Sequence, residues 1–349
     1  MKYLILIAIL AGPGADDPTA LLEQIIIIPG VSGHEERVRE AIRERLPEWA
    51  AKVAVEDEHG NLIVEVGEGK PWVLFVAHMD ETGLEVMKIA DDGSLVVRHR
   101  GGFLPTLYEG EIVEVHAKEG VVPGVVPPRE RGQGRFGYDS IRVVLGTRSA
   151  EETQGLGVAV GDTITVPKRF DPMLGGKKMG RGMDDRVGSA AILWAIRELD
   201  PEALSKKVTF VWSTEEEIGL EGAKGLAAVK KPDFVFAVDT YVSSDSPRES
   251  PRFGHVRLGE GAVVRAIDGS NIAPFNDVMR LLDLARDRKI PLEYGVTGGG
   301  NDGSAFVPGG AVDLPIAWPL RNSHTAVEII HAGDLMALSR LVVAIAEEF

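Results

Sequence analysis

The 349-residue sequence contains no cysteine, which excludes a disulfide framework and any metal site built on thiolates. A metal bound by this chain must therefore be held by histidine, aspartate and glutamate. Basic residues are also in deficit, because 38 lysines and arginines face 53 acidic residues, for a formal net charge of −15. A nucleic-acid-binding surface needs a basic patch, so the charge balance argues against nucleic acid as a partner. It suits cation binding, although a surplus of surface acid explains it equally well.

Long hydrophobic runs are absent as well. The longest begins the chain, MKYLILIAILAGPGA, with one lysine, about ten apolar residues and then small residues. Such a run is too short to span a bilayer, so no stable membrane span is expected. Its layout is that of a signal peptide, and we expect a leader over residues 1–15 and export to the periplasm or the medium. The alternative is an N-terminal strand or helix packed into a cytoplasmic protein.

The hydrophobic pattern predicts an α/β protein with an inserted β-domain. Near-continuous apolar runs at 72–77, 208–212, 234–238 and 314–320 are typical of strands buried on both faces, and amphipathic helices at 19–28, 274–287 and 334–349 flank them. Between about 88 and 170, short alternating segments are separated by Gly, Pro and Asp turns, which indicates a small barrel or sandwich. We therefore expect a helix-sandwiched sheet domain over 16–87 and 171–349, interrupted by an all-β barrel over 88–170.

The stretch 208–219, VTFVWSTEEEIG, joins one of these strands to three consecutive glutamates, Glu215, Glu216 and Glu217. Adjacent carboxylates repel one another, and a buried charge is costly unless it is paired or binds a metal. These side chains must therefore point to water or meet a cation. A structural alternative is a helix-capping box formed by Thr214 and Glu217, and Ser32 and Glu35 fit the same box.

Other strands also deliver metal-binding residue types to their carboxyl ends. His78 and Asp80 follow the strand at 72–77 and share a side of the extended chain, so Asp80 can orient the imidazole of a metal-bound His78. Asp239 ends the strand at 234–238, and His324 lies four residues beyond the strand at 314–320. A lone histidine in such a position is usually structural, but the recurrence of the pattern favours ligands.

Asp184 and Asp185, in GRGMDDRVG, precede an apolar helix. A carboxylate at a helix amino end is ordinarily a cap, which is the alternative for either residue. In open α/β sheets, ligands bind at the carboxyl edge of the strands, where Asp184 can join the other candidates. Two histidines and at least three carboxylates exceed the needs of one zinc ion, and they suffice for two ions about 3.5–4 Å apart that share a carboxylate. Zinc is the first expectation, with cobalt or manganese also suited to this ligand set.

Several motifs together resemble one family. HMDETG, GMDDRVG, STEEEIGLEGA, AVDTY and NSHTAVE, with IPGVSGHEERVREAI, GTRSAEE and VGDTITV, are similar to the glutamyl/leucyl-type aminopeptidases that assemble as tetrahedral particles. Those are two-metal peptidases of the zinc-peptidase and phosphorylase-like fold with an inserted β-domain. Two differences, Thr82 and Asn301, stand where the family usually has an apolar residue and threonine, and they concern substrate preference rather than metal binding.

The resemblance implies a role for each candidate. Asp184 would bridge two metals, with a cis peptide before Asp185, and Glu216 would be the general base. The remaining positions would be His78 and Asp239 on one metal, Glu217 and His324 on the other, and Asp80 beside His78. Glu215 receives no role.

The expected function is hydrolysis of the N-terminal residue from peptides by a homo-oligomeric two-metal aminopeptidase. Two alternatives stay open: a related metal-dependent carboxypeptidase or N-deacylase, and a non-catalytic, metal-stabilised peptide-binding scaffold. A glycosidase using Glu216 and Glu217 is disfavoured, because neighbouring residues seldom flank a sugar at about 5–9 Å. The basic loop at 129–135 is expected to be solvated, unless it contacts a partner or an acidic substrate.

Overall fold

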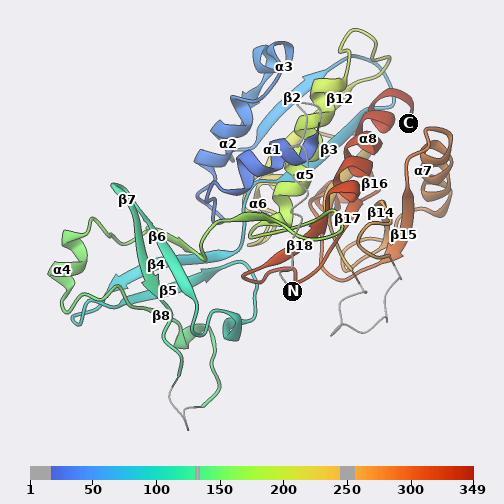
Figure 1. Cartoon of the computed structure of the whole chain (residues 1–349). Helices are drawn as coiled ribbons and strands as arrows, with labels where there is room; N and C mark the ends of the chain where they lie inside the picture. Colours follow the sequence, from blue (N-terminus) through green and yellow to red (C-terminus); the bar gives the residue numbers. More distant parts are fainter. Residues whose placement is uncertain (1–16, 130–131, 133, 244–255) are drawn as a thin grey trace, which may run out of the picture.

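The computed structural model describes residues 17–129, 132, 134–243 and 256–349. The expected leader at 1–15 lies outside these ranges. The main body is built on a mixed sheet in the order β1-β2-β12-β3-β13-β17-β14-β15, with β16 paired to β13 (Figure 1). Strands β12, β3, β13 and β17 are parallel to one another, and β2 and β14 lie antiparallel on either side of them. The strands are β1 Val55–Glu56, β2 Leu62–Val66, β3 Val73–His78, β12 Val208–Ser213, β13 Phe234–Val242, β14 Ala262–Ile267, β15 Leu292–Val296, β16 Val312–Asp313 and β17 Ile316–Leu320.

Helices cover both faces of this sheet, which explains the continuous apolar runs. On β3, Phe75 packs into the core beneath α1, α5 and α8, whereas Leu74 and Val76 pack on the opposite side beneath α6 and η3. Alternate strand residues face opposite ways, so a strand covered on both faces must be apolar throughout. The expected helix-sandwiched mixed sheet is thus confirmed. The helices are α1 Pro18–Ile26, α2 Glu36–Arg43, α3 Glu48–Val53, α5 Met183–Glu198, α6 Glu221–Val229, α7 Phe275–Asp287, α8 Ala332–Glu348 and the 3-10 segment η3 Asp302–Gly309.

The insert is a separate antiparallel sheet that projects from the main body (Figure 1). Its order is β7-β6-β9-β4-β5-β8, and a bridge between Val125 and Val144 joins its two ends, so that the sheet curls into a barrel-like shape. Strand β4 crosses the expected boundary between 87 and 88, because its residues from Gly83 onward already pair with β5 and β9. The elements are β4 Gly83–Ile89, β5 Leu95–Arg100, η1 Pro105–Leu107, β6 Ile112–Ala117, β7 Gly120–Val125, η2 Tyr138–Ser140, β8 Arg142–Val143, α4 Ala150–Gly155 and β9 Thr163–Thr165.

A small antiparallel sheet brings the chain back from the insert. It consists of β10 Phe170–Pro172, β11 Lys177–Gly180 and β18 Glu328–His331, in that order. Because β11 leads into α5 and β18 precedes α8, this sheet links the two helices that pack on the same face of the main sheet. Within the described ranges, none of the helices has both the length and the apolar character needed to cross a bilayer.

The expected capping boxes do not form. Helix α6 begins only at Glu221, and the Thr214 hydroxyl donates instead to the carbonyl of His59 at 2.8 Å. At α2 the N-cap residue is Glu35 without a side-chain cap, while the Ser32 hydroxyl donates to Asp80 at 2.6 Å. The predicted box at Ser32 is therefore wrong, and the capping alternative for Thr214 does not hold either, because both hydroxyl groups bond to residues that are distant in the chain.

Candidate metal centre

The parallel strands bring His78, Ser213 and Asp239 to one edge of the sheet. Ser213 of β12 is directly opposite His78 of β3 in the register. On the other side, Ala237 of β13 is opposite Val76, so Asp239 lies level with His78. Residues two apart on a strand share a side, so all three side chains lie on the face of the sheet covered by α6 and η3. The strand ends thus form a row, as expected from the sequence.

Asp80 fastens the end of β3 to the turn after β12. Its two carboxylate oxygens accept the backbone N–H groups of Glu216 at 3.0 Å and Glu217 at 3.1 Å. One of them also lies 3.3 Å from Nδ1 of His78. Asp80 is fully buried, which would raise its pKa, but its bonds to His78 and Ser32 hold that pKa below the usual value. Asp80 therefore orients His78 and also places both glutamates, a second task that the sequence did not reveal.

Asp184 and Asp185, although adjacent, contact different groups. The peptide between Asp184 and Asp185 is cis. One oxygen of Asp184 lies 3.2 Å from Nε2 of His78, and the other lies 3.4 Å from Nε2 of His324. Asp185 accepts the N–H groups of Gly188 at 3.1 Å and of His78 at 3.0 Å. The backbone of α5 is non-helical at Asp184 and Asp185, so Asp185 caps the regular helix that follows, and Asp184 faces the two histidines.

His324 lies in the loop after β17 with a left-handed backbone, φ 58°. Its Nε2 is 3.2 Å from a carboxylate oxygen of Glu217. Its Nδ1 is 2.5 Å from the carbonyl oxygen of Gly102, in the insert. A carbonyl can only accept, so Nδ1 carries the proton and Nε2 is the nitrogen with a free lone pair in the neutral ring. The insert therefore orients one of the candidate ligands.

Asp239 lies at the same edge but is paired with a cation. One of its oxygens is 2.9 Å from a guanidinium nitrogen of Arg265, which is 2% exposed. Arg265 also pairs with Asp268 at 3.0 Å. Glu216 points into the centre, with a carboxylate oxygen 3.9 Å from Nε2 of His78. Glu215 turns away, and its Oε1 lies beside Gly33, in agreement with its having no assigned role.

The electrostatics indicate a centre that requires positive charge. Burial raises the pKa of Glu216 well above its usual value and also raises those of Glu217 and Asp239. Burial alone would lower the pKa of the two histidines, but their carboxylate partners raise that of His78 well above the usual value and that of His324 to about 12. Crowded carboxylates stabilise a cation placed among them, whether a protonated histidine or a metal ion.

The arrangement also meets a geometric requirement for a metal. One ligand atom from each of His78, Asp184 and Glu217 lies within 4.8 Å of the others, the one such group among the residues described. Imidazole nitrogen and carboxylate oxygen are ligands that zinc, cobalt and manganese accept. The residues present therefore fit a divalent cation, with His324 3.2 Å from Glu217 and Asp239 level with His78 at the same edge of the sheet.

Asp302 and Glu328 are buried residues at the centre that the sequence did not single out. Asp302, at the start of η3, accepts the Ser213 hydroxyl, and burial raises its pKa to about 7. It lies within the glycine-rich segment 297–304, TGGGNDGS. Glu328 stands in NSHTAVE, four residues after His324. This position, four residues after a candidate ligand, is the feature of the sequence that could have pointed to Glu328.

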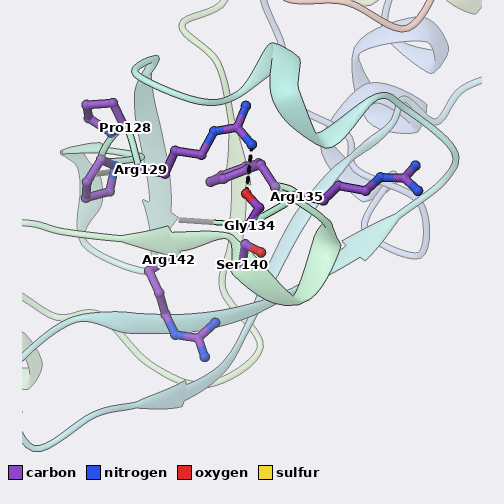
Figure 2. Close-up of a pocket in the computed structure, with 8 residues that line it drawn as sticks. Pro128, Arg129, Gly134, Arg135, Ser140 and Arg142 are labelled. Atoms are coloured by element: carbon purple, nitrogen blue, oxygen red, sulfur yellow. Dashed lines mark hydrogen bonds between the residues drawn. The ribbon is translucent and has the colours of Figure 1, made fainter. Parts of the chain in front are cut away.

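The described arginines of the basic loop, Arg129 and Arg135, do not converge on one anion site. The Arg129 guanidinium pairs with Glu109 at 3.1 Å and donates to the carbonyl of Gly134 at 3.0 Å. Figure 2 shows Arg135 and Arg142 extending in other directions around the same pocket. Guanidinium groups that diverge cannot bind one phosphate or carboxylate together. For the residues of the loop that the structure describes, this arrangement favours the expectation of a solvated loop.

Comparison with known proteins gives a consistent result. The family model of the M42 glutamyl aminopeptidases matches residues 60–341. A putative aminopeptidase of Acetivibrio thermocellus is 34% identical, covering 94% of this chain and 98% of its own length. The lysyl aminopeptidase of Pyrococcus furiosus is 30% identical, with 94% and 96% covered.

Among solved structures, the TET1 peptidase of Pyrococcus horikoshii superposes with a TM-score of 0.87 at 36% identity, over 95% of this chain and all of the other. That peptidase can assemble into a tetrahedron or a large octahedral shell. The family match, the length of the alignments and the fold agree with the resemblance drawn from the motifs. The chain belongs to the M42 glutamyl aminopeptidase family, and it is a peptide-bond hydrolase of the aminopeptidase type.

Proposed function

We propose that this aminopeptidase uses two divalent cations bridged by Asp184. The observation that carries the proposal is that the two oxygens of Asp184 face different histidines, at 3.2 Å for His78 and 3.4 Å for His324. A single metal ion would need only one of the two Asp184 oxygens, together with the histidine that faces it. His78 and Asp239 would complete one site, and Glu217 and His324 the other. We propose zinc as the metal, with cobalt or manganese as the alternatives that the ligand set admits.

When bound, two such cations act as Lewis acids that lower the pKa of a shared water and polarise the scissile carbonyl. The protein residues move the proton. Glu216 is the candidate general base: it is largely buried, lies 3.9 Å from His78, and has its backbone held by Asp80. In our proposal the Glu216 carboxylate takes a proton from the attacking water and gives it to the leaving amine. Asp80 keeps His78, Glu216 and Glu217 in place during the exchange.

The charge of the centre supports a substrate with a free amino terminus. Four carboxylates, Asp184, Glu216, Glu217 and Asp239, lie at one edge of the sheet, and an α-ammonium group can pair with carboxylates left free by the metals. An acylated amino terminus has no such charge. This reasoning favours removal of the N-terminal residue over the carboxypeptidase and deacylase alternatives.

A panel of aminoacyl-p-nitroanilides tests the proposal. Glu, Asp, Leu, Lys and Ala derivatives, with an N-acetylated control, are assayed with the protein as purified, after chelation, and after zinc, cobalt or manganese is added back. We expect metal-dependent cleavage of the free-amine substrates alone. Preferential cleavage of the N-acetylated control would favour the deacylase, and a metal-loaded but inactive protein would favour the scaffold.

The same panel on Glu216→Gln tests the general base. Glutamine keeps the shape but cannot accept the proton, so kcat should fall by roughly 10²–10⁴-fold. Metal content, measured by atomic absorption, should stay that of the unmodified protein, because Glu216 is not a proposed ligand. Full activity of Glu216→Gln would refute its role.

We also propose a homo-oligomer and export. The first follows from the assembly of the TET1 peptidase, 36% identical to this chain. The second rests on the sequence layout of residues 1–15 alone.

A further inference from the structure

Glu328 is a buried carboxylate that the proposed reaction does not use. It begins β18, has 0% exposure, and contacts two segments that are far apart in the chain. One of its oxygens accepts the backbone N–H groups of Gly182 at 2.9 Å and Met183 at 2.7 Å. The other accepts the backbone N–H of His324 at 3.0 Å.

These donors belong to the segments that carry two proposed metal ligands. Gly182 and Met183 directly precede Asp184, and His324 is itself a ligand candidate. One carboxylate therefore ties the loop of the bridging residue to the loop of a terminal ligand. The two side chains meet 3.4 Å apart, from Oδ2 of Asp184 to Nε2 of His324.

Both segments need a contact that restrains their backbone conformation. Gly182 has φ 81° and His324 has φ 58°, so the backbone is left-handed at each end of the contact. For a residue with a Cβ, such as His324, that conformation costs roughly 1–2 kcal/mol and persists only where the surroundings impose it. Three backbone N–H groups that donate to one buried side chain supply this restraint.

Glutamine could not replace this carboxylate. All three backbone groups that hydrogen-bond to its oxygens are donors, and the guanidinium of Arg181 lies 3.9 Å away. An amide offers one oxygen, so its NH₂ group would face an N–H on one of the two segments and leave that donor unsatisfied. The arrangement parallels Asp80, which holds Glu216 and Glu217 by their N–H groups.

We propose that Glu328 is a positioning residue that sets the metal affinity of the centre by holding the Asp184 and His324 segments in register. The inference rests on the proposed metal function. It acts through backbone geometry and requires no contact of Glu328 with metal or substrate.

The test is metal binding by Glu328→Gln. Metal-free protein is titrated with zinc against a chromophoric chelator, and its fold is checked by circular dichroism. We expect zinc affinity to fall by about 10–100-fold, the usual effect of losing a group that orients metal ligands. Excess zinc should restore much of kcat with KM unchanged, which a merely structural defect would not allow.

Glu85→Gln is the matched control. Glu85 is also buried, but its carboxylate bonds to Arg98 and Arg100 within the insert and to none of the proposed ligands. Its zinc affinity should match that of the unmodified protein. If Glu328→Gln fails to fold, Glu328→Asp takes its place, because the shorter side chain keeps the charge but cannot span both segments.

The outcomes separate the two proposals. Unchanged zinc affinity in a folded Glu328 variant overturns this inference and leaves the metal function intact. Absence of zinc, cobalt and manganese binding by the unmodified protein overturns the metal function itself. Weakened binding in the Glu328 variant with normal binding in Glu85→Gln supports the positioning role.

Discussion

At the scale of single residues, identical side chains that are neighbours in the sequence make different contacts in this protein. Asp184 and Asp185 are neighbours, yet one faces two histidines and the other caps α5 and holds the backbone of His78. Among the three consecutive glutamates, Glu217 contacts His324, Glu216 approaches His78, and Glu215 lies beside Gly33. Composition restricts the ligands to His, Asp and Glu, but the direction of each side chain depends on partners from other segments.

Asp313 gives a prediction at this scale. It is 2% exposed and lies beside Asn301 and Asp268. Burial, with the nearby Asp268, raises its pKa from 3.8 to about 8. Between these values the native state binds more protons than the unfolded state, so the free energy of unfolding should fall as pH rises from about 4 to 8. The contribution is fully present below pH 4 and lost above pH 8.

Asp313→Asn should remove this pH dependence, because the amide stays neutral. We expect it to raise the free energy of unfolding by on the order of 2–4 kcal/mol at pH 8 and by little at pH 4, measured by urea denaturation. Asp287→Asn, whose side chain is 76% exposed, is the control and should change stability by less than about 0.5 kcal/mol at both pH values. Equal effects of Asp313→Asn at the two pH values would contradict the assignment.

At the scale of elements, the insert takes part in the centre. The turn between β5 and η1 brings the carbonyl of Gly102 to His324 and places Gly101 against Glu217. Gly101 has φ 78°, and a Cβ there would lie 2.7 Å from Thr82 and 3.1 Å from the Cβ of Glu217. The turn therefore requires glycine at 101, both for its backbone and for the space beside a proposed ligand.

Gly101→Ala should consequently lose stability and activity together. The left-handed backbone alone costs about 1–2 kcal/mol, and displacement of Glu217 should lower kcat or metal affinity further. Gly102→Ala is the matched control, since a Cβ there meets no atom within 4 Å and the carbonyl is kept. Thermal unfolding and the p-nitroanilide rate measure both effects. Equal behaviour of the two variants would show that the turn does not support the centre.

At the scale of the whole molecule, the prediction concerns the association of several copies of this chain. Large apolar side chains remain exposed around α7, with Ile272 and Phe275 each 74% exposed and Tyr294 62% exposed. Exposed apolar groups of this size are a feature of interaction surfaces. With the proposed homo-oligomer, light scattering should give a native mass that is a multiple of the 37.6 kDa chain. A single 37.6 kDa species at micromolar concentration would contradict the proposed homo-oligomer. Export of the chain stays a prediction.

Much of the fold could be predicted because its causes are local. Alternation and apolar runs are properties of neighbouring residues, so they indicated the buried strands, the flanking helices and the β-insert. The expected helix at 334–349 is observed as α8, Ala332–Glu348. The capping boxes do not form because a hydroxyl can donate to a group that is distant in the chain. The Ser32 hydroxyl, for example, donates to Asp80, 48 residues away.

The sequence by itself determined which residue types could form the centre and at which edge of the sheet they would gather. Without cysteine the ligands had to be histidines and carboxylates, and parallel strands end at a common edge. Only the tertiary structure decided that Arg265 pairs with Asp239 and that Glu328 joins the loops of Asp184 and His324. The physical reason is distance along the chain: Glu328 bonds to Met183 across 145 residues, and no local pattern encodes such a contact.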